Sequence, residues 1–264
     1  MLTEVKNQIK VMILSVKYNI MRQMVNKVTF ITNILFMILN NASFILQWVI
    51  LFSLKDDIGG YTIKEVLLLW GLAASIFGIS HIVFYKAFQI PDLIINGKLD
   101  SFLVQPKNVL LSVITSDTSI SAIGDLIYGY ICLFIYGFTL KNFMLFTIFS
   151  ITGAIILTSF VTVIGSICFW IVRADMLTDS LANVMLNFAT YPGGIFKTGI
   201  KIILYTIIPV GVANYLPVDL IINFNFVGFA YVIAFAISIT ILAFFVFNKG
   251  LKRYSSSNLM SSRI

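Results

Sequence analysis

The chain has 264 residues and a net charge of +7, with 59% hydrophobic and 11% charged residues. Soluble globular chains carry about 45–50% apolar and about 25% charged residues, so a soluble enzyme is nearly excluded because too few charges remain to cover its surface. The 24 Phe, 11 Tyr and 3 Trp exclude intrinsic disorder. The composition predicts an all-α membrane protein that crosses the bilayer several times.

Residues 1–27 are predicted to form an amphipathic elbow helix at the membrane surface. At about 100° per residue, one stripe collects apolar side chains, namely Leu2, Val5, Ile9, Met12, Ile13, Val16, Ile20 and Met24. Lys6, Lys10 and Lys17 border this stripe, where they can reach anionic lipid phosphates. Charges interrupt the segment too often for a cleavable signal peptide. A second interpretation has the same helix also touching a cytoplasmic partner.

Weakly charged segments of about 20 residues predict six membrane spans. They cover approximately 28–54, 63–86, 118–140, 142–172, 200–216 and 226–248, within one transmembrane domain over 28–254 that is followed by a cytoplasmic tail over 255–264. The fifth span is short and contains Pro209 and Gly211. The semi-apolar stretch 214–225 after it predicts a re-entrant or interfacial piece on the outer face.

The distribution of Lys and Arg predicts that both termini are cytoplasmic. With the N-terminus inside, only Lys55, Lys64 and Lys141 of the 18 basic residues fall outside, while Lys197 and Lys201 count as cytoplasmic. Cytoplasmic loops of membrane proteins carry an excess of Lys and Arg over the loops on the other side. The positive charge therefore reports orientation and contact with anionic lipid, and it gives no case for nucleic acid.

The loop over 87–108 is the most informative segment between spans. Pro91-Asp92 predicts a helix start and Gly97 a helix stop, with the apolar trio Leu93, Ile94 and Ile95 between them. A second apolar segment, Phe102-Leu103-Val104, precedes Pro106. Exposed apolar side chains on a short cytoplasmic helix predict a docking element for a protein partner or the membrane surface. The alternative is a loop packed against the protein's own helices.

Residues 173–201 are predicted to lie on the cytoplasmic side and to contain a second interfacial helix. Leu181, Val184, Met185 and Phe188 recur there at helical spacing. Tyr191-Pro192-Gly193-Gly194 then ends the helix, either as a flexible joint before the fifth span or as a plain turn.

Few polar residues fall inside the predicted spans. Asp125 either hydrogen-bonds a neighbouring helix or lines a pathway, because intramembrane carboxylates face a bundle interior or a cavity. His81 is a proton-relay residue or a packed one. The polar side chains of the first span resemble interhelical glue, namely Asn33, Asn40, Asn41 and Gln47. Cys132 and Cys168 lie in apolar runs and are interpreted as packing residues; no metal-ligand spacing is present.

Small residues predict close helix packing in two spans. Gly71, Ala74, Ser75 and Gly78 share the second span, and Gly153 lies in the fourth.

The sequence contains no catalytic constellation, so no enzymatic activity is expected of this chain. It has no G-x-x-x-x-G-K-[ST] motif and hence no P-loop of its own for ATP. It also shows no internal repeat, which argues against an inverted-repeat carrier.

One stretch carries a family resemblance. Ile94, Gly97, Leu99, Asp100, Leu103 and Pro106 match the pattern I-x-x-G-x-L-D-x-x-L-x-x-P. This loop, together with the basic N-terminal helix and six spans, resembles the membrane subunit of ABC-2 type transporters, in particular bacterial permeases that pair with a separate ATPase. Tyr191-Pro192, Ile208-Pro209-Val210-Gly211 and Tyr215-x-Pro217 are similar to that family's fifth-span region.

The resemblance implies an exporter of drugs, lipids or peptides across the bacterial plasma membrane. Two permeases, identical or homologous, would sit on two copies of an ATP-binding-cassette ATPase that binds ATP and Mg, and this chain would bind no cofactor. The loop would be the coupling helix, with the substrate pathway at the permease dimer interface. The coupling residues would be Pro91, Leu93, Ile94, Ile95, Gly97, Leu99, Asp100, Phe102 and Pro106. The alternative is an ion- or proton-coupled carrier or channel that depends on Asp125 or His81 and needs no ATPase.

Overall fold

A computed structural model describes residues 2–171 and 174–255, and this part of the chain is helical, without a β-strand. Arg173, Arg263 and residues 256–264 of the predicted tail lie outside the described residues. The elements are α1 Leu2–Gln23, α2 Lys27–Leu54, α3 Ile63–Val83, η1 Tyr85–Gln89, α4 Ile90–Ile95, α5 Asp100–Leu103, α6 Val109–Ile114, α7 Ser121–Gly137, α8 Leu140–Gly165, η2 Ser166–Phe169, α9 Asp175–Ala189, η3 Gly193–Ile195, α10 Thr198–Thr206, η4 Gly211–Tyr215, α11 Leu216–Ile222 and α12 Phe226–Leu251.

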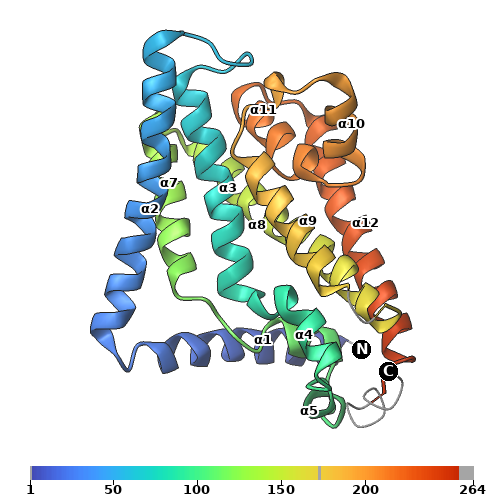
Figure 1. Cartoon of the computed structure of the whole chain (residues 1–264). Coiled ribbons are helices and arrows are strands. Elements are labelled where there is room, and N and C mark those ends of the chain that lie inside the picture. Colours follow the sequence, from blue (N-terminus) through green and yellow to red (C-terminus); the bar gives the residue numbers. More distant parts are fainter. Residues whose placement is uncertain (1, 172–173, 256–264) are drawn as a thin grey trace.

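The helices form an upright bundle between two ends (Figure 1). Helices α2, α3, α7, α8, α9 and α12 run between the lower and the upper end of Figure 1. The lower end carries α1, which lies across it, the last turns of α12 and the segment α4–α6. The upper end carries α10 and α11.

Four helices of the described chain are long and apolar enough to cross a membrane: α2, α3, α8 with η2, and α12. They correspond to the first, second, fourth and sixth predicted spans. The third predicted span appears as α7, which is apolar but has only 17 residues. The chain is therefore a multi-pass membrane protein.

The predicted fifth span over 200–216 is not one continuous helix. The chain breaks after Thr206, and α10 meets the helical stretch Gly211–Ile222 at an angle of 83°, with Pro209 in the break. Both helices lie at the upper end (Figure 1), where Gly194 contacts the backbone of Gly59 in the α2–α3 loop. This bend fits the predicted re-entrant piece, although it begins earlier in the chain than expected.

Helix α9 takes the path that the prediction gave to the fifth span. It runs from the lower to the upper end beside α8 (Figure 1) and contacts both α8 and α3. The predicted surface helix in this region is thus packed into the bundle. As a consequence Lys197 and Lys201 lie at the upper end with α10, where Lys201 lines a cavity together with Tyr61.

Local sequence signals explain where the long helices begin. The Asn26 side chain caps α2 by accepting a 3.2 Å hydrogen bond from the Thr29 backbone N–H. At α3, Thr62 and Glu65 form a capping box in which the Glu65 carboxylate accepts a 2.7 Å hydrogen bond from the Thr62 N–H. The Asn225 side chain caps α12 as Asn26 caps α2, by accepting a hydrogen bond from the Gly228 backbone N–H.

Helix α3 is the centre of the bundle, and small residues let its neighbours approach. A side chain at Gly78 would meet the backbone of α7 at 2.8 Å from the Leu126 nitrogen and 2.9 Å from the Ala122 oxygen. Gly153 on α8 contacts Ile76 of α3 in the same close manner. The predicted close packing is therefore confirmed for both helices.

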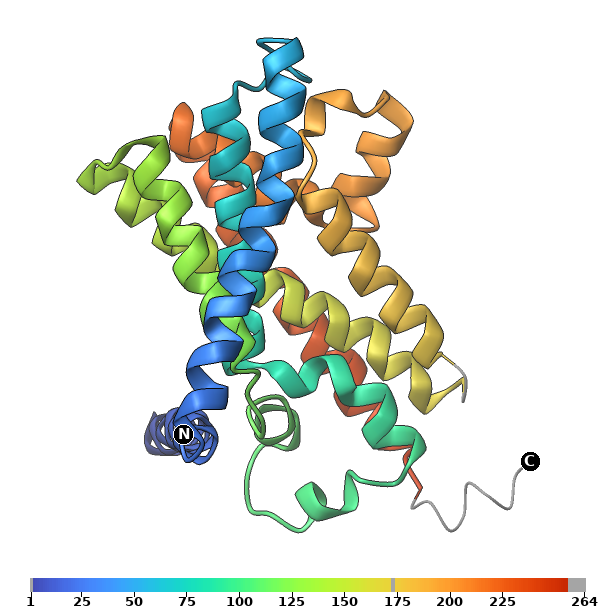
Figure 2. The same cartoon turned by 60° about the vertical axis from the view of Figure 1, so that its left-hand side comes forward.

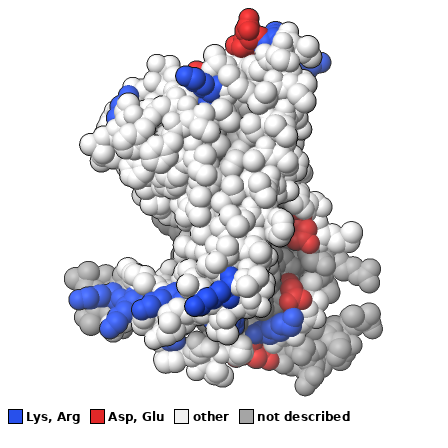
Figure 3. Space-filling view, turned by 90° about the vertical axis from the view of Figure 1, so that its left-hand side faces the viewer, with Lys and Arg blue, Asp and Glu red and all other residues white. Residues whose placement is uncertain are grey.

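Charged side chains gather at the two ends. Figure 3 shows a band of Lys and Arg over α1 and the rest of the lower end, a smaller group at the upper end, and an uncharged surface between them. Such a surface fits a hydrocarbon layer between two polar regions.

Candidate functional site

The loop between α3 and α7 contains the helix that the sequence predicts, and its ends lie where expected. Pro91 occupies the first turn of α4, and Gly97 lies just after the C-cap residue Asn96, with φ of +66°. The Gly97 N–H donates to Ile94 O at 3.3 Å, and the Lys98 N–H donates to Leu93 O at 2.9 Å. This pair of bonds is a Schellman motif, which fixes the direction in which the chain leaves the helix.

The expectation that Leu93 and Ile94 are exposed is wrong. Ile94 is fully buried, Leu93 is 5% exposed and Ile95 is half-buried. They join a core cluster in which Ile90, Leu93, Ile94 and Leu99 pack with Phe169 of η2 and Phe247 of α12. The alternative interpretation, a loop packed against the protein's own helices, holds for α4 because its apolar face covers the lower ends of α8 and α12.

The tip of the loop is the part that stays exposed. Val104 is 84% exposed and Leu103 is 42% exposed, although both are apolar. Asp100 and Pro106 are also exposed, while Phe102 is half-buried against the cluster. Residues 100–107 therefore form a projecting tip with apolar side chains at its surface, and we use the name loop tip for them.

The C-terminal end of α12 also holds the loop. A side chain at Gly250 would collide with the Phe169 ring, so α12 and η2 are in close contact there. Beyond α12, the Tyr254 ring packs edge-on against Phe169 with centroids 6.3 Å apart. Burial and the neighbouring Asp100 carboxylate raise the pKa of Tyr254 to about 12, so its phenol is neutral at physiological pH.

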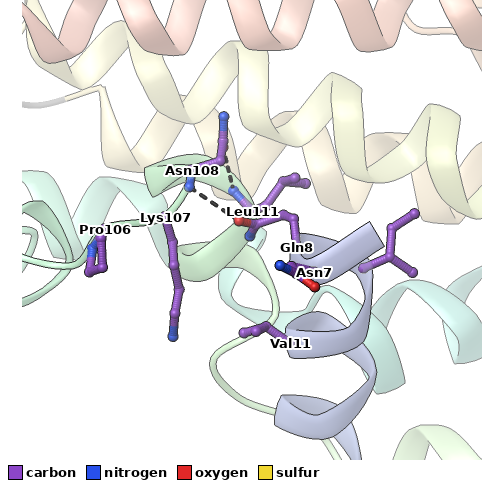
Figure 4. A pocket seen from close by; sticks show the side chains of 8 residues that line it. Asn7, Gln8, Val11, Pro106, Lys107, Asn108 and Leu111 are labelled. Atoms are coloured by element: carbon purple, nitrogen blue, oxygen red, sulfur yellow. Dashed lines mark hydrogen bonds between the residues drawn. The ribbon is translucent and has the colours of Figure 1, made fainter. Parts of the chain in front are cut away.

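Helix α1 is fastened to the segment that follows the loop tip. Ser15 Oγ donates to Thr115 O at 2.7 Å, and Asn19 Nδ2 donates to the same oxygen at 3.3 Å. Figure 4 shows Gln8 on α1 accepting a hydrogen bond from the Asn108 N–H at the start of α6, beside a cavity of about 720 Å³. The polar face of α1 therefore faces the protein.

An ion-pair group closes the same junction. Asp117 accepts a 3.0 Å hydrogen bond from Arg22 of α1 and lies 3.8 Å from Lys86 of η1. Asp117 is thus the point at which α1, η1 and the segment before α7 meet. Pairs with this degree of exposure contribute roughly 0–1 kcal/mol each, so the pairing serves mainly to position the elements.

Asp125 lies within the bundle and is bonded to another helix, as one of the two interpretations predicts. Asn41 Nδ2 on α2 donates a 2.6 Å hydrogen bond to Asp125 Oδ1 on α7. Asp125 is 4% exposed and Asn41 is 8% exposed. The second carboxylate oxygen, Oδ2, is buried without a hydrogen-bond partner among the described residues.

The Asp125–Asn41 pair borders a cavity of about 250 Å³ that four helices line. Its other lining residues are Met37 and Asn40 of α2, Trp70, Ala73, Ala74 and Phe77 of α3, Leu186 of α9 and Thr190 directly after α9. Asn40, which the sequence interpretation treated as interhelical glue, thus lies at this cavity and is exposed. We call the space between α2 and α9, with α3 behind it, the α2–α9 groove.

Helix α9 contributes polar residues that the sequence interpretation did not single out. Asn183 and Asn187 are both exposed and lie one helical turn apart, while Thr190 follows at the cavity. The signal was present in the sequence, because asparagines four residues apart in an apolar helix mark one polar face. The prediction of an interfacial helix rested instead on the helical spacing of Leu181, Val184, Met185 and Phe188.

His81 is a packed residue at the lower end of α3. Its ring lies 3.7 Å from the Phe77 centroid and 4.1 Å from the Phe88 centroid, and Nδ1 is 3.1 Å from Phe77 O. The two cysteines also pack as expected, Cys132 with Tyr128 and Cys168 with the cluster under α4. Within the described residues, no three His, Cys, Asp or Glu side chains form a metal-binding group.

Comparison with protein families identifies the class of this fold. Residues 13–258 match the model of the ABC-2 family transporter proteins, which covers every spanning helix and the loop tip. The chain belongs to this family and is a membrane permease of ABC transporters. Searches of curated proteins and of solved structures found no match.

Proposed function

We propose that this chain is the permease subunit of an ATP-driven exporter in a bacterial plasma membrane, with both termini in the cytoplasm. Two permeases, identical or homologous, pair with two copies of an ATPase that binds ATP and Mg. The observation that carries the proposal is the loop tip, because its apolar residues Leu103 and Val104 are exposed at the end that holds α1 and the last turns of α12. Neighbouring apolar side chains that are exposed on an otherwise charged end of the molecule mark an interaction site.

The loop is built to pass on a movement of that tip. Leu99 immediately before the tip is fully buried, and Ile90 and Ile94 anchor α4 on Phe169 and Phe247. Close-packed interiors transmit displacement because they have little room to compress. When the ATPases close on ATP, a shift of the tip therefore moves the lower ends of α8 and α12. We therefore assign contact with the ATPase to the loop tip and not to Leu93 and Ile94, which are buried.

Helix α1 completes the cytoplasmic surface as the elbow helix. Its polar side holds Thr115 and Asn108, whereas Ile9 and Ile13 on the predicted apolar stripe are exposed. Exposed Lys10 and Lys17 lie near that stripe. We assign the apolar stripe to the inner membrane surface and the lysines to anionic lipid headgroups.

In this proposal α2, α3, α7, α8, α9 and α12 are the six spans, and the α2–α9 groove lines the pathway at the permease dimer interface. Exposed asparagines on α2 and α9 are costly against lipid and are tolerated at a water-filled cavity or a protein interface. Near the upper end, Trp48 of α2 and Tyr191 after α9 touch edge to face at 5.7 Å. Toward the lower end the two helices diverge in both Figure 1 and Figure 2.

The test is co-purification of the tagged permease with a separately expressed ATP-binding-cassette ATPase. We expect Val104→Asp to leave the permease folded and to remove the ATPase from the complex, because it places a charge on the apolar docking surface. Val25→Asp is the matched control, since Val25 is 85% exposed at the turn between α1 and α2, away from the tip. If Val104→Asp retains the ATPase and full ATP-driven transport, the tip is not the coupling site.

A further inference from the structure

The buried Asp125–Asn41 pair in the α2–α9 groove leaves one carboxylate oxygen without a hydrogen-bond partner among the described residues. Asn41 satisfies only Oδ1 of Asp125, and Oδ2 is buried without a partner. A buried polar group without a partner costs about 1–3 kcal/mol. The oxygen without a partner belongs to a residue that lines a cavity of about 250 Å³, so a partner in that cavity would lie beside the Asp125 carboxylate.

The chemistry of the Asp125 oxygen without a partner selects a cation. The oxygen is an acceptor, and no Lys or Arg in the described chain forms an ion pair with Asp125. The charge of the carboxylate is thus left without a counter-charge from the protein. An ammonium group supplies both the positive charge and N–H donors, and charge-assisted hydrogen bonds are the stronger kind.

The remaining lining suits the apolar part of such a molecule. Trp70 and Phe77 offer aromatic faces, and Met37 and Leu186 add apolar surface. Aromatic faces also attract cations through their ring quadrupoles. Ala73 and Ala74 keep the α3 side of the cavity open, so an apolar chain can lie along that helix while its amine reaches Asp125.

We propose that Asp125 and Asn41 form the recognition point for the ammonium group of cationic amphipathic cargo. This inference rests on the proposed export function and narrows its cargo from drugs, lipids or peptides in general to amphiphiles that carry an amine. Asn41 positions the carboxylate, Oδ2 accepts from the ammonium group, and the aromatic residues of α3 hold the apolar part.

The experiment uses the purified full-length permease in lipid nanodiscs, without ATPase. Two photoreactive probes of equal chain length are compared, a long-chain alkylamine and the matching alkyl carboxylate, each with a diazirine at the same carbon. We expect the amine to label Met37 and Leu186 and the carboxylate not to label them. Asp125→Asn should lower the labelling by about tenfold, the size of one lost charge-assisted hydrogen bond.

Three further variants separate recognition from folding. Asp125→Glu keeps the charge and should retain most of the labelling. Ala73→Met fills the cavity without altering a charge and should reduce labelling by the amine. Asp219→Asn removes a carboxylate at the upper end, where Asp219 accepts a hydrogen bond from Tyr61, and should change nothing.

Equal labelling of Asp125→Asn and the unmodified protein, or equal labelling by both probes, would overturn the assignment. The outcome is independent of the ATPase experiment, because labelling needs no partner. Loss of the amine preference with an intact permease–ATPase complex refutes the cargo class alone. Loss of the complex with intact labelling refutes the coupling proposal alone.

Discussion

Asn41 on α2 donates a 2.6 Å hydrogen bond to Asp125 on α7, and this bond joins the least buried long helix of the bundle to its interior. Replacing Asn41 with Leu leaves both oxygens of a buried carboxylate unsatisfied. We expect the permease to lose about 1–3 kcal/mol of stability, measured as the shift of its unfolding transition in detergent.

A double-mutant cycle checks that the loss comes from this bond. The variant Asn41→Leu/Asp125→Leu removes both polar partners and should be more stable than the sum of the single changes indicates, by about 0.5–3 kcal/mol. Strictly additive effects would show that the two residues stabilise the bundle independently.

The α3–α7 contact depends on the missing side chain of Gly78. A Cβ there would lie 2.8 Å from the Leu126 nitrogen, and backbone cannot move aside as a flexible side chain does. We expect Gly78→Val to destabilise the permease by about 1–3 kcal/mol through overpacking, seen as a lower unfolding temperature. Gly199→Ala is the control, because nothing lies within 4 Å of its added Cβ; a similar loss in both variants would argue against close packing as the cause.

The long apolar helices and their close contacts were predictable because their causes are local. Each of α2, α3, α8 and α12 contains enough apolar residues in one run to cross a bilayer. Gly71 and Gly78 lie seven residues apart, which puts both on one side of α3, and both face α7. The helix start at Pro91 and the stop at Gly97 follow from the residues themselves.

The sequence could offer burial of the loop only as one of two alternatives, because distant residues decide it. A six-residue helix such as α4 has no long periodic pattern, and Ile94 is buried by Phe169 and Phe247, which come from two other helices. The path of α9 was missed for a related reason. Polar residues such as Asn183 and Asn187 lower the apolar content of α9, and its contacts with α3 and α8 appear only in the folded bundle.

The direction of the loop tip depends on the left-handed backbone of Gly97. Its φ of +66° is unfavourable for residues with a Cβ by about 1 kcal/mol or more. We expect Gly97→Ala to speed hydrogen exchange of the backbone amides at positions 97 and 98 by roughly fivefold to tenfold. These two amides close the Schellman motif. Gly97→Asn should behave closer to the unmodified protein, since Asn tolerates this conformation. Unchanged exchange in Gly97→Ala would mean that the motif does not hold the loop.

Lys201 distinguishes the two possible fifth spans. If α9 crosses the membrane, α10 and Lys201 lie outside with Tyr61, whose loop shares a cavity with them. If residues 200–216 cross instead, Lys201 lies inside. In a background with Cys132→Ala and Cys168→Ala, we expect Lys201→Cys to react with a membrane-impermeant maleimide on intact cells. Lys98→Cys, next to the loop tip, should react only after the cells are opened. Labelling of Lys201→Cys only in opened cells would restore the span over 200–216 and return α9 to the cytoplasmic surface.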